Sequence, residues 1–184
     1  MRATRAASLL IVSTLAAGVL GGAGPAAAHG HGPFGKPCEP GYEYVATSTK
    51  KSVKAQGRGI QKGIGVTLAN YNGGSKTMTS VFTSETEGEV GISVSGKLKA
   101  KSSVVLAEVE HEYGVEVSAK LRVKIGNQIR VKTPPKKTSY ARYGVFRLKV
   151  TGYSRYINAN CTKGTKIKST ILTPHLVGWY TYNR

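Results

Sequence analysis

The sequence predicts an all-β protein, an elongated antiparallel β-sheet or sandwich with a long central hairpin and one disulfide. Two patterns indicate strands: apolar and polar residues alternate with a period of two along most of the chain, and Gly, Asn or Pro bounds nearly every alternating run. The third observation is that the chain has two cysteines, Cys38 and Cys161. We find no segment with a clear helical period after residue 28, so we expect no helix there.

The N-terminus has the three parts of a secretory signal peptide. Arg2 and Arg5 give it a positive start, and Ser8–Leu20 is apolar but too short to span a membrane. The small residues Ala26–Ala28 then form a cleavage site. We therefore expect residues 1–28 to be removed and the protein to be secreted and extracellular.

Two regions follow the signal. Residues 29–40 are rich in Gly and Pro, which predicts a flexible N-terminal tail. Residues 41–184 are long enough to form a single all-β domain with its own core. No run after the signal is apolar enough for a transmembrane helix, so we expect no stable membrane span.

Cys38 and Cys161 are predicted to form a disulfide, because export takes the chain to an oxidising compartment. The bond would close a loop of more than 120 residues. A crosslink of that length contributes up to roughly 4–5 kcal/mol in the chain-entropy model. A catalytic thiol would need a nearby base and a free partner cysteine, so a structural bond is the favoured interpretation.

The strands are predicted from the N-terminus onward. Tyr42–Thr49 is the first. Ile60–Ala69 and Lys76–Thr83 should form a hairpin around Asn70–Gly74, because Asn and Gly tolerate the positive φ angles of tight turns. Thr133–Lys137 is predicted to be a loop, since neither of its prolines can donate to a strand ladder. Three more strands complete the prediction: Tyr143–Tyr156, Thr165–Thr173 and Leu176–Tyr182.

The long central hairpin is predicted from alternation and charge. Val105–Ile125 alternates throughout, and residues 85–101 alternate as well. In an antiparallel register where paired residue numbers sum to 209, six pairs of opposite charge face one another. These pairs are Lys101–Glu108, Lys99–Glu110, Lys97–Glu112, Glu89–Lys120, Glu87–Arg122 and Glu85–Lys124. Ser103–Leu106 lacks a residue suited to a tight turn, so we expect a wide reversal or a crossing between sheets.

The charge is large and uneven. The formal net charge is +18, or +16 without Arg2 and Arg5. Residues 29–84 carry seven basic and two acidic side chains, residues 85–116 carry three Lys and seven Glu, and residues 117–184 carry fifteen basic side chains and no acid. Such an excess attracts polyanions. Outside a cell it favours an anionic surface polymer, anionic lipid or acidic partner over nucleic acid; a basic surface dispersed by self-repulsion is the alternative.

We expect no enzyme activity, no catalytic residue and no cofactor. The chain contains no Asp, so a Ser-His-Asp triad is impossible. The Glu residues lie opposite cationic residues in the predicted hairpin, which is typical of a salt-bridged sheet face, and no Cys/His spacing fits zinc. His111 falls on the apolar side of the central strand, which predicts an interior histidine. Trp179, Tyr180 and Tyr182 are expected to pack in the core.

The tail carries the candidate partner-binding residues His31, Pro33, Phe34 and Lys36. An extended segment of this kind can lie in a partner's groove or add a strand to a sheet edge; plain disorder is the alternative. Cleavage after Ala28 would also leave a His29-Gly30-His31 terminus, whose nitrogen atoms suit Cu(II) or Ni(II). A polar tail without metal is the favoured interpretation, so no metal site is predicted.

Long strands rich in Ser, Thr, Val and Gly around an amphipathic hairpin resemble the aerolysin-like β pore-forming toxins. Proteins of that family refold a hairpin into a transmembrane pore. A spanning strand needs about 9–11 alternating residues, and Val90–Ala100 and Val109–Ala119 have that length. The chain departs from the family in the many charges on one face of the hairpin and in its short length.

The chain also resembles small secreted β proteins of actinobacteria. The features that carry this resemblance are Cys38, Tyr143–Gly152, Asn160-Cys161 and Gly178-Trp179. Within that group it is similar to the adaptor subunit of Streptomyces umbrella toxin particles. The resemblance implies a non-enzymatic adaptor used in bacterial antagonism, which bridges a lectin-like subunit and a repeat-containing toxin subunit.

Three functions therefore stand as hypotheses. The first is a secreted adaptor of a toxin complex, which acts through protein–protein interaction. The second is a small pore-forming toxin that acts on membranes. The third is a secreted inhibitor or wall-binding protein. Dye leakage from liposomes distinguishes the second from the first, because only a pore-forming protein permeabilises lipid by itself.

Overall fold

The computed structural model describes residues 38–56 and 60–184. Strands dominate this part of the chain, and two short helices interrupt them. The elements are β1 Gly41–Ala46, α1 Lys50–Gln56, β2 Gln61–Gly63, β3 Leu68–Tyr71, β4 Met78–Thr83, β5 Gly88–Gly91, β6 Ser93–Gly96, α2 Ser102–Tyr113, β7 Lys120–Val123, β8 Gln128–Thr133, β9 Thr138–Ile157 and β10 Ile167–Asn183. The prediction of an all-β, antiparallel protein is confirmed in outline.

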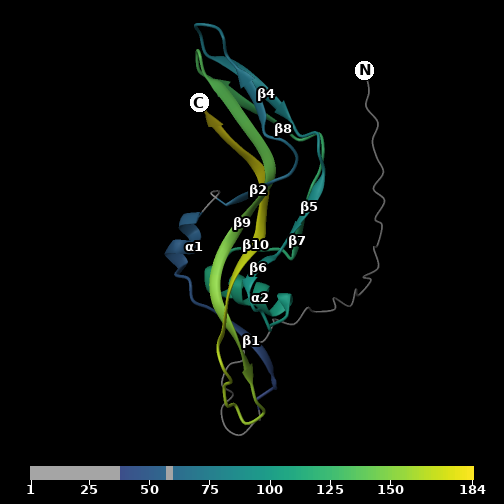
Figure 1. Ribbon diagram of the computed structural model, residues 1–184, viewed down its shortest axis with the longest axis vertical. Helices are drawn as coiled ribbons and strands as arrows, with labels where there is room; N and C mark the ends of the chain where they lie inside the picture. The colour runs from purple at the N-terminus through teal and green to yellow at the C-terminus, as the bar shows by residue number, and fades with distance from the viewer. Residues whose placement is uncertain (1–37, 57–59) are drawn as a thin grey trace, which may run out of the picture.

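Two long strands organise the molecule. β9 has 20 residues and β10 has 17, and they pair antiparallel along nearly the whole elongated structure (Figure 1). β1, β2 and β3 pair with the other edge of β9, and β6 pairs with β10. Two separate ribbons, β4–β8 and β5–β7, lie beside these long strands. We call the part with β1, β6, α1 and α2 the lower half, and the part with the remaining short strands the upper half.

The buried face of β9 changes sides along the strand. In the upper half its odd-numbered residues are buried, as at Ala141 and Tyr143. In the lower half its even-numbered residues are buried, as at Leu148 and Val150. Successive residues of a strand point to opposite faces. The long strands are therefore covered on one face in the upper half and on the other face in the lower half.

A bulge in β10 shifts its register at the point where the buried face of β9 changes sides. Below the bulge Ile171 pairs with Val150, and above it Val177 pairs with Val145. The register shifts by one between Pro174 and Leu176. A one-residue shift moves every later side chain to the other face relative to its partner strand. Odd-numbered residues of β10 consequently contribute to the buried side in both halves.

The fold has two hydrophobic cores, one on each side of the long strands. The lower core contains Tyr44, Val53, Ala100, Val105, Val109, Tyr113, Val117, Leu148, Val150 and Ile171. The upper core contains Val90, Val123, Tyr143 and Val145, with Val177 and Trp179 packed against it. Helices cover the lower core and the β5–β7 ribbon covers the upper one.

The prediction that no helix follows residue 28 is wrong, because α1 and α2 are helical. The predicted hairpin around Asn70–Gly74 is also wrong. β3 pairs with β9, whereas β4 pairs with β8, so the chain crosses between two sheets at this point. The Asn72 side chain is buried and donates to the carbonyl oxygens of Lys76 and Thr133, which stabilises the crossing.

The C-terminal strands agree better with expectation. Pro134–Lys137 connects β8 to β9, which confirms a loop at Thr133–Lys137. The strand expected at Tyr143–Tyr156 lies inside β9. The two strands expected on either side of Pro174 are one continuous strand, β10, because the bulge accommodates the proline. The Pro174 carbonyl accepts a hydrogen bond from Ser118 N at 2.9 Å.

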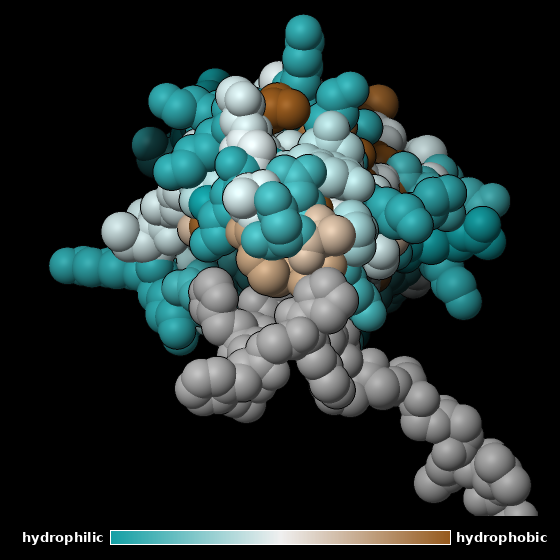
Figure 2. Space-filling view, turned by 90° about the horizontal axis from the view of Figure 1, so that it is seen from below, coloured by the Kyte–Doolittle hydropathy of each residue, from teal (hydrophilic) through white to brown (hydrophobic). Residues whose placement is uncertain are grey.

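The disulfide between Cys38 and Cys161 is present, as predicted. It joins the chain ahead of β1 to the turn after β9, and Cys38 N donates to Ala159 O at 3.1 Å. The bond closes the lower end of the molecule. Seen from that end, the surface is mostly hydrophilic, with apolar residues only in small separate groups (Figure 2).

Candidate functional site

The most unusual part of the structure is residues 92–119, which we call the inserted segment. Strands β5 and β7 flank it and pair with each other, from Gly88↔Val123 to Gly91↔Lys120. Ile92 N donates to Ala119 O at 3.1 Å, which adds one more step to this ladder. In all these pairs the residue numbers sum to 211. The inserted segment is thus a long excursion between two strands that are already held side by side.

The first part of the inserted segment leaves β5 for another sheet. β6 pairs with β10, with Val94 opposite Ile171. Every residue of β6 is exposed, and the Val94 side chain is 41% exposed. An exposed valine in the middle of a strand contributes little to stability. This strand is short and lies at the edge of the main sheet.

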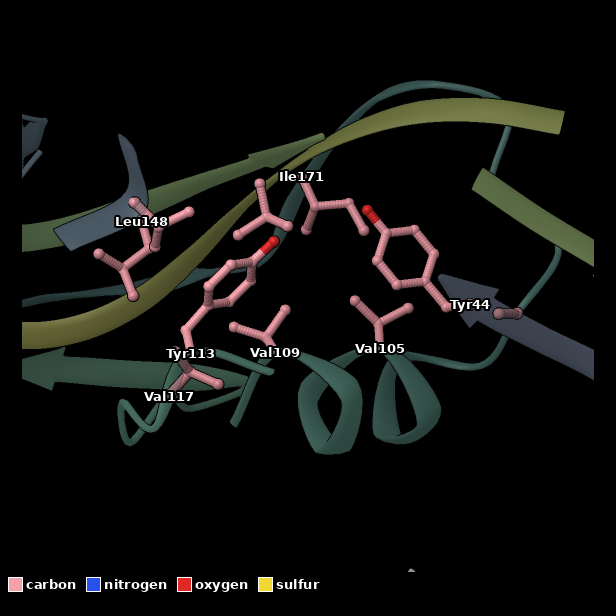
Figure 3. Close-up of a cluster of buried hydrophobic side chains, with 10 residues drawn as sticks. Tyr44, Val105, Val109, Tyr113, Val117, Leu148 and Ile171 are labelled. Atoms are coloured by element: carbon pink, nitrogen blue, oxygen red, sulfur yellow. The ribbon is translucent and has the colours of Figure 1, made fainter. Parts of the chain in front are cut away.

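Helix α2 forms the middle of the inserted segment and covers the lower core. Val105, Val109 and Tyr113 are four residues apart, so they lie on one face of the helix, and all three are buried. Figure 3 shows these side chains directed from α2 into the cluster. Their partners in the cluster include Tyr44, Leu148 and Ile171. Burying three such side chains contributes several kcal/mol, at about 1.5–3 kcal/mol each.

The N-terminal end of α2 is weakly specified by its own sequence. Lys101 occupies the N-cap position in an extended conformation, and its side chain makes no capping hydrogen bond. Two β-branched residues, Val104 and Val105, follow in the first turns, where they lose side-chain freedom. Gly114 ends the helix in the left-handed region at φ 61°. Burial against the lower core, more than helix propensity, therefore stabilises α2.

Carboxylates of α2 bind backbone amides instead of lysines. Glu108 Oε1 accepts from Ala46 N at 3.3 Å, and Glu110 Oε1 accepts from Val117 N at 3.2 Å. The Tyr113 hydroxyl donates to Ser48 O at 3.0 Å. These contacts tie the helix to β1, to the turn after β1 and to the return of the chain toward β7.

The predicted central hairpin is therefore wrong in this structure. Val105–Ile125 is not one strand, because its first half is α2, and the β5–β7 ladder has a sum of 211 instead of 209. Of the six predicted charge pairs, one forms an ion pair among the described residues: Lys120 Nζ lies 3.0 Å from Glu89 Oε1. Glu108 and Glu110 instead accept hydrogen bonds from backbone amides, because helix formation removes them from the lysines.

Two tyrosines of the lower core have raised pKa values. Burial is the largest cause of the rise in the Tyr44 pKa to about 12, and the neighbouring Tyr113 adds to it. Burial also raises the pKa of Tyr113, with a further contribution from the negative charge of Glu112. An unshifted phenol is also protonated at neutral pH, so the raised pKa values affect the protein only in alkaline solution.

The predicted histidine and tail sites lie either outside the described part of the chain or on its surface. The tail residues His31, Pro33, Phe34 and Lys36, and the His29-Gly30-His31 terminus, lie outside the described residues. His111 is exposed in the last turn of α2, so the prediction of an interior histidine is wrong. Within residues 38–56 and 60–184, no group of three or more His, Cys, Asp or Glu side chains could hold a metal ion. In the same ranges no helix is long and apolar enough to cross a membrane.

The C-terminal aromatic residues divide between the two faces of β10. Trp179 packs against the upper core, with its ring 4.9 Å from that of Tyr143, and its Nε1 donates to Asn127 Oδ1 at 2.7 Å. Tyr180 faces the other way and is exposed. Core packing is therefore correct for Trp179 and wrong for Tyr180.

Comparison with known proteins assigns this chain to no family. No protein-family model matches the sequence, and no curated protein matches it. Among solved structures the chain is similar to one titled "Crystal structure of Lamprey immune protein", with 12% sequence identity and a TM-score of 0.28. The match covers 77% of this chain and 53% of the other, so this chain spans about half the length of that neighbour.

Proposed function

We propose that the protein permeabilises membranes by refolding residues 92–119 into a hairpin that continues the β5–β7 ladder. One observation carries the proposal. The inserted segment is folded as an edge strand, a connection and a weakly specified helix, yet its sequence alternates with the period of a strand. Disagreement between local sequence pattern and adopted structure is expected where a segment has two functional conformations.

Continuing the observed register gives the refolded hairpin a mostly apolar face. A sum of 211 pairs Ile92 with Ala119, Val94 with Val117 and Leu98 with Tyr113. Gly96–Val115, Ala100–His111 and Ser102–Val109 complete this face, which includes one histidine and one serine. The reversal then falls at Val104–Ala107, an apolar tip that can enter lipid. Each arm has about 12 residues, which exceeds the 9–11 that a spanning strand needs.

The opposite face of the same hairpin is polar and its charges are complementary. Lys99 faces Glu112 and Lys101 faces Glu110, while Ser93 faces Ser118. Opposite charges across two strands favour the pairing. In the present structure these lysines and glutamates do not meet, so refolding exchanges the backbone contacts of Glu110 for a cross-strand pair.

Paired substitutions in β6 test the proposal. Val94 and Ser95 are neighbours and both are exposed, so Lys at either position leaves the starting fold intact. In the refolded hairpin Val94 belongs to the lipid-facing side and Ser95 to the polar side. A cation on the lipid side costs about 2–4 kcal/mol near the bilayer centre and about 0–1 kcal/mol near the interface, and Val94 is the third residue of its arm. We expect Val94→Lys to slow dye release from phosphatidylcholine–phosphatidylglycerol vesicles, and Ser95→Lys to retain it.

The difference in dye release between the two variants decides the test. Equal release by the two variants would show that the inserted segment does not enter lipid in this register. No release by the unmodified protein, residues 29–184, from these vesicles or from intact bacterial cells would contradict membrane permeabilisation itself. Circular dichroism of both variants controls for folding.

An adaptor role in a secreted toxin complex is the second candidate. The observation that favours it is the disulfide, which fixes Cys38, and thus the point where residues 29–37 join the domain, at one end of the molecule beside the turn after β9. A segment attached there is placed to bind a neighbouring subunit. The proposed partners are a lectin-like and a repeat-containing toxin subunit, as in the Streptomyces umbrella particles. Both candidate functions need export, which the disulfide supports.

Deletion of His29–Lys36 tests the adaptor role. We expect the shortened protein to keep its fold and disulfide and to lose one co-purifying partner from culture supernatant. Unchanged co-purification would contradict binding through the tail. Vesicle leakage should be unaffected by this deletion, so the two candidate functions are tested independently.

A further inference from the structure

The upper half carries a face of tyrosine and arginine side chains that the membrane proposal does not use. The register of β3, β9 and β10 arranges it in rows of direct cross-strand neighbours, which share one face of a sheet. Tyr71 and Arg184 flank Thr138, Tyr182 lies beside Tyr140, and Tyr180 lies beside Arg142. We call Tyr71, Tyr140, Arg142, Tyr180, Tyr182 and Arg184 the tyrosine platform.

Two rings of the platform are exposed and two are partly exposed, and those of Tyr140, Tyr180 and Tyr182 contact one another. Tyr71 is 58% exposed and Tyr180 is 39% exposed. Tyr140 and Tyr182 are stacked, with centroids 5.0 Å apart and planes 10° apart, and Tyr180 lies 5.8 Å from Tyr182. The residues on the other face of these strands, such as Tyr143 and Trp179, belong to the upper core. A contiguous set of exposed aromatic rings indicates a binding surface.

Arg142 is held in place within the platform. Its Nε donates to Gln61 Oε1 at 3.0 Å, and Gln61 Nε2 donates to the carbonyl oxygens of Arg142 and Gly178. The side chain lies across Gly63, where a Cβ would come within 2.4 Å of Arg142 Cδ. The guanidinium carbon is 5.7 Å from the centroid of Tyr180. A side chain fixed in this way loses little conformational freedom when it binds a ligand.

Arg142 has no carboxylate partner among the described residues. The ion pairs there are Lys120–Glu89 and Arg155–Glu43, so no acidic side chain neutralises Arg142. Residues 117–184 contain no Asp or Glu at all. Charge complementarity therefore favours an anionic occupant.

We propose that the tyrosine platform binds an acidic polysaccharide. Flat aromatic rings stack on the apolar faces of sugar rings, and a fixed guanidinium forms bidentate hydrogen bonds with a carboxylate or phosphate on the same chain. Successive rows of the sheet place tyrosine rings beside an arginine guanidinium. A polymer of charged sugars needs both groups, because each unit has a sugar ring and an anionic group. Binding places the protein at an anionic cell surface, and it does not depend on refolding of the inserted segment.

Matched variants separate this site from attraction by net charge. Polygalacturonate is the acidic polysaccharide probe, and polyglutamate is the polyanion without sugar rings. Tyr156 is 39% exposed, the same fraction as Tyr180, but lies at the lower end of β9. We expect Tyr180→Ala to weaken polygalacturonate binding by about tenfold, as for a central interface residue. Tyr156→Ala should leave binding within about twofold, the spread expected away from a contact.

The arginine gives a second matched pair. Arg142→Gln and Lys149→Gln each remove one positive charge, and Lys149 is an exposed residue on the opposite face of β9. We expect Arg142→Gln alone to weaken polygalacturonate binding by about tenfold, and both variants to weaken polyglutamate binding equally. Equal effects of the two variants on polygalacturonate would overturn the proposal in favour of charge alone. A loss on Tyr180→Ala for phosphatidylglycerol vesicles but not for polygalacturonate would overturn it in favour of a lipid surface.

Discussion

The same two strands are covered in different ways in the upper and lower halves of the molecule. In the upper half, the β5–β7 ribbon lays Val90 and Val123 on one face of β9 and β10. In the lower half, α2 lays Val105 and Val109 on the other face. The β5–β7 ribbon has the structure that its alternating sequence predicts. Helix α2 is helical although its sequence also alternates. Helix α2 is therefore the part that we propose refolds, because its structure and its sequence pattern disagree.

The largest expected effect concerns the lower half. Replacing Cys38 and Cys161 by serine removes a crosslink between residues 123 positions apart. We expect a loss of up to about 5 kcal/mol in the free energy of unfolding, measured with urea. Hydrogen exchange should increase first in β1 and later in the β4–β8 ribbon. Equal increases in both regions would show that the two halves unfold as one unit and would weaken the comparison.

The second prediction uses the lower-core phenol of Tyr44. Below pH 10 the group is protonated in both the folded and the unfolded chain, so it adds no pH dependence. Between pH 10 and about 12 the unfolded chain loses its proton while the folded protein keeps it. Stability should then fall by about 1.4 kcal/mol per pH unit. Tyr44→Phe should flatten this decline in urea titrations, and Tyr71→Phe, which alters an exposed phenol, should not.

The smallest prediction compares two glycines. Gly114 ends α2 and Gly126 lies between β7 and β8, with φ angles of 61° and 83° and no atom close to an added Cβ. Alanine at either position should cost about 1 kcal/mol, because both backbones are left-handed. Only Gly114→Ala weakens α2, so only this variant should release vesicle dye faster than the unmodified protein. Faster release by both variants would show that general instability controls leakage.

The comparison also shows which parts of the fold the sequence can predict. The loop at Thr133–Lys137 and the long strand β9 follow from prolines and from alternation, which are local signals. The disulfide follows from two cysteines in a chain whose N-terminal sequence predicts export. The loop and β9 depend on residues that are close in sequence. The disulfide is predictable because two cysteines can pair in only one way.

Helix α2 and the change of buried face depend on distant residues. Alternation at Val105, Val109 and Tyr113 fits a strand as well as a helix face, because these positions are both odd-numbered and four apart. The partners that decide the outcome, Tyr44 and Ile171, come from β1 and β10. A spacing of four that ends at Gly114 was the available signal for the helix. Pro174 is a local signal for an irregularity in this strand, because proline within a sheet is confined to edges and bulges, but the register of the strand depends on the elements packed against β9.

Disulfide trapping tests most directly whether residues 92–119 refold in the register of β5 and β7. Lys101 and Glu110 lie nine residues apart along α2, about 14 Å, and become direct partners about 5 Å apart in the hairpin. A disulfide requires Cα atoms closer than about 7 Å. The control pair, Lys97 and Glu110, is four residues out of register, about 13 Å apart in the hairpin.

The double variant Lys101→Cys/Glu110→Cys should form no bond between these positions in solution and should form it on vesicles, as peptide mapping would show. The control variant Lys97→Cys/Glu110→Cys should form none in either condition. Vesicle-bound protein that is permeabilising but leaves the Lys101→Cys/Glu110→Cys pair unlinked, or that links the control pair instead, would contradict refolding in this register.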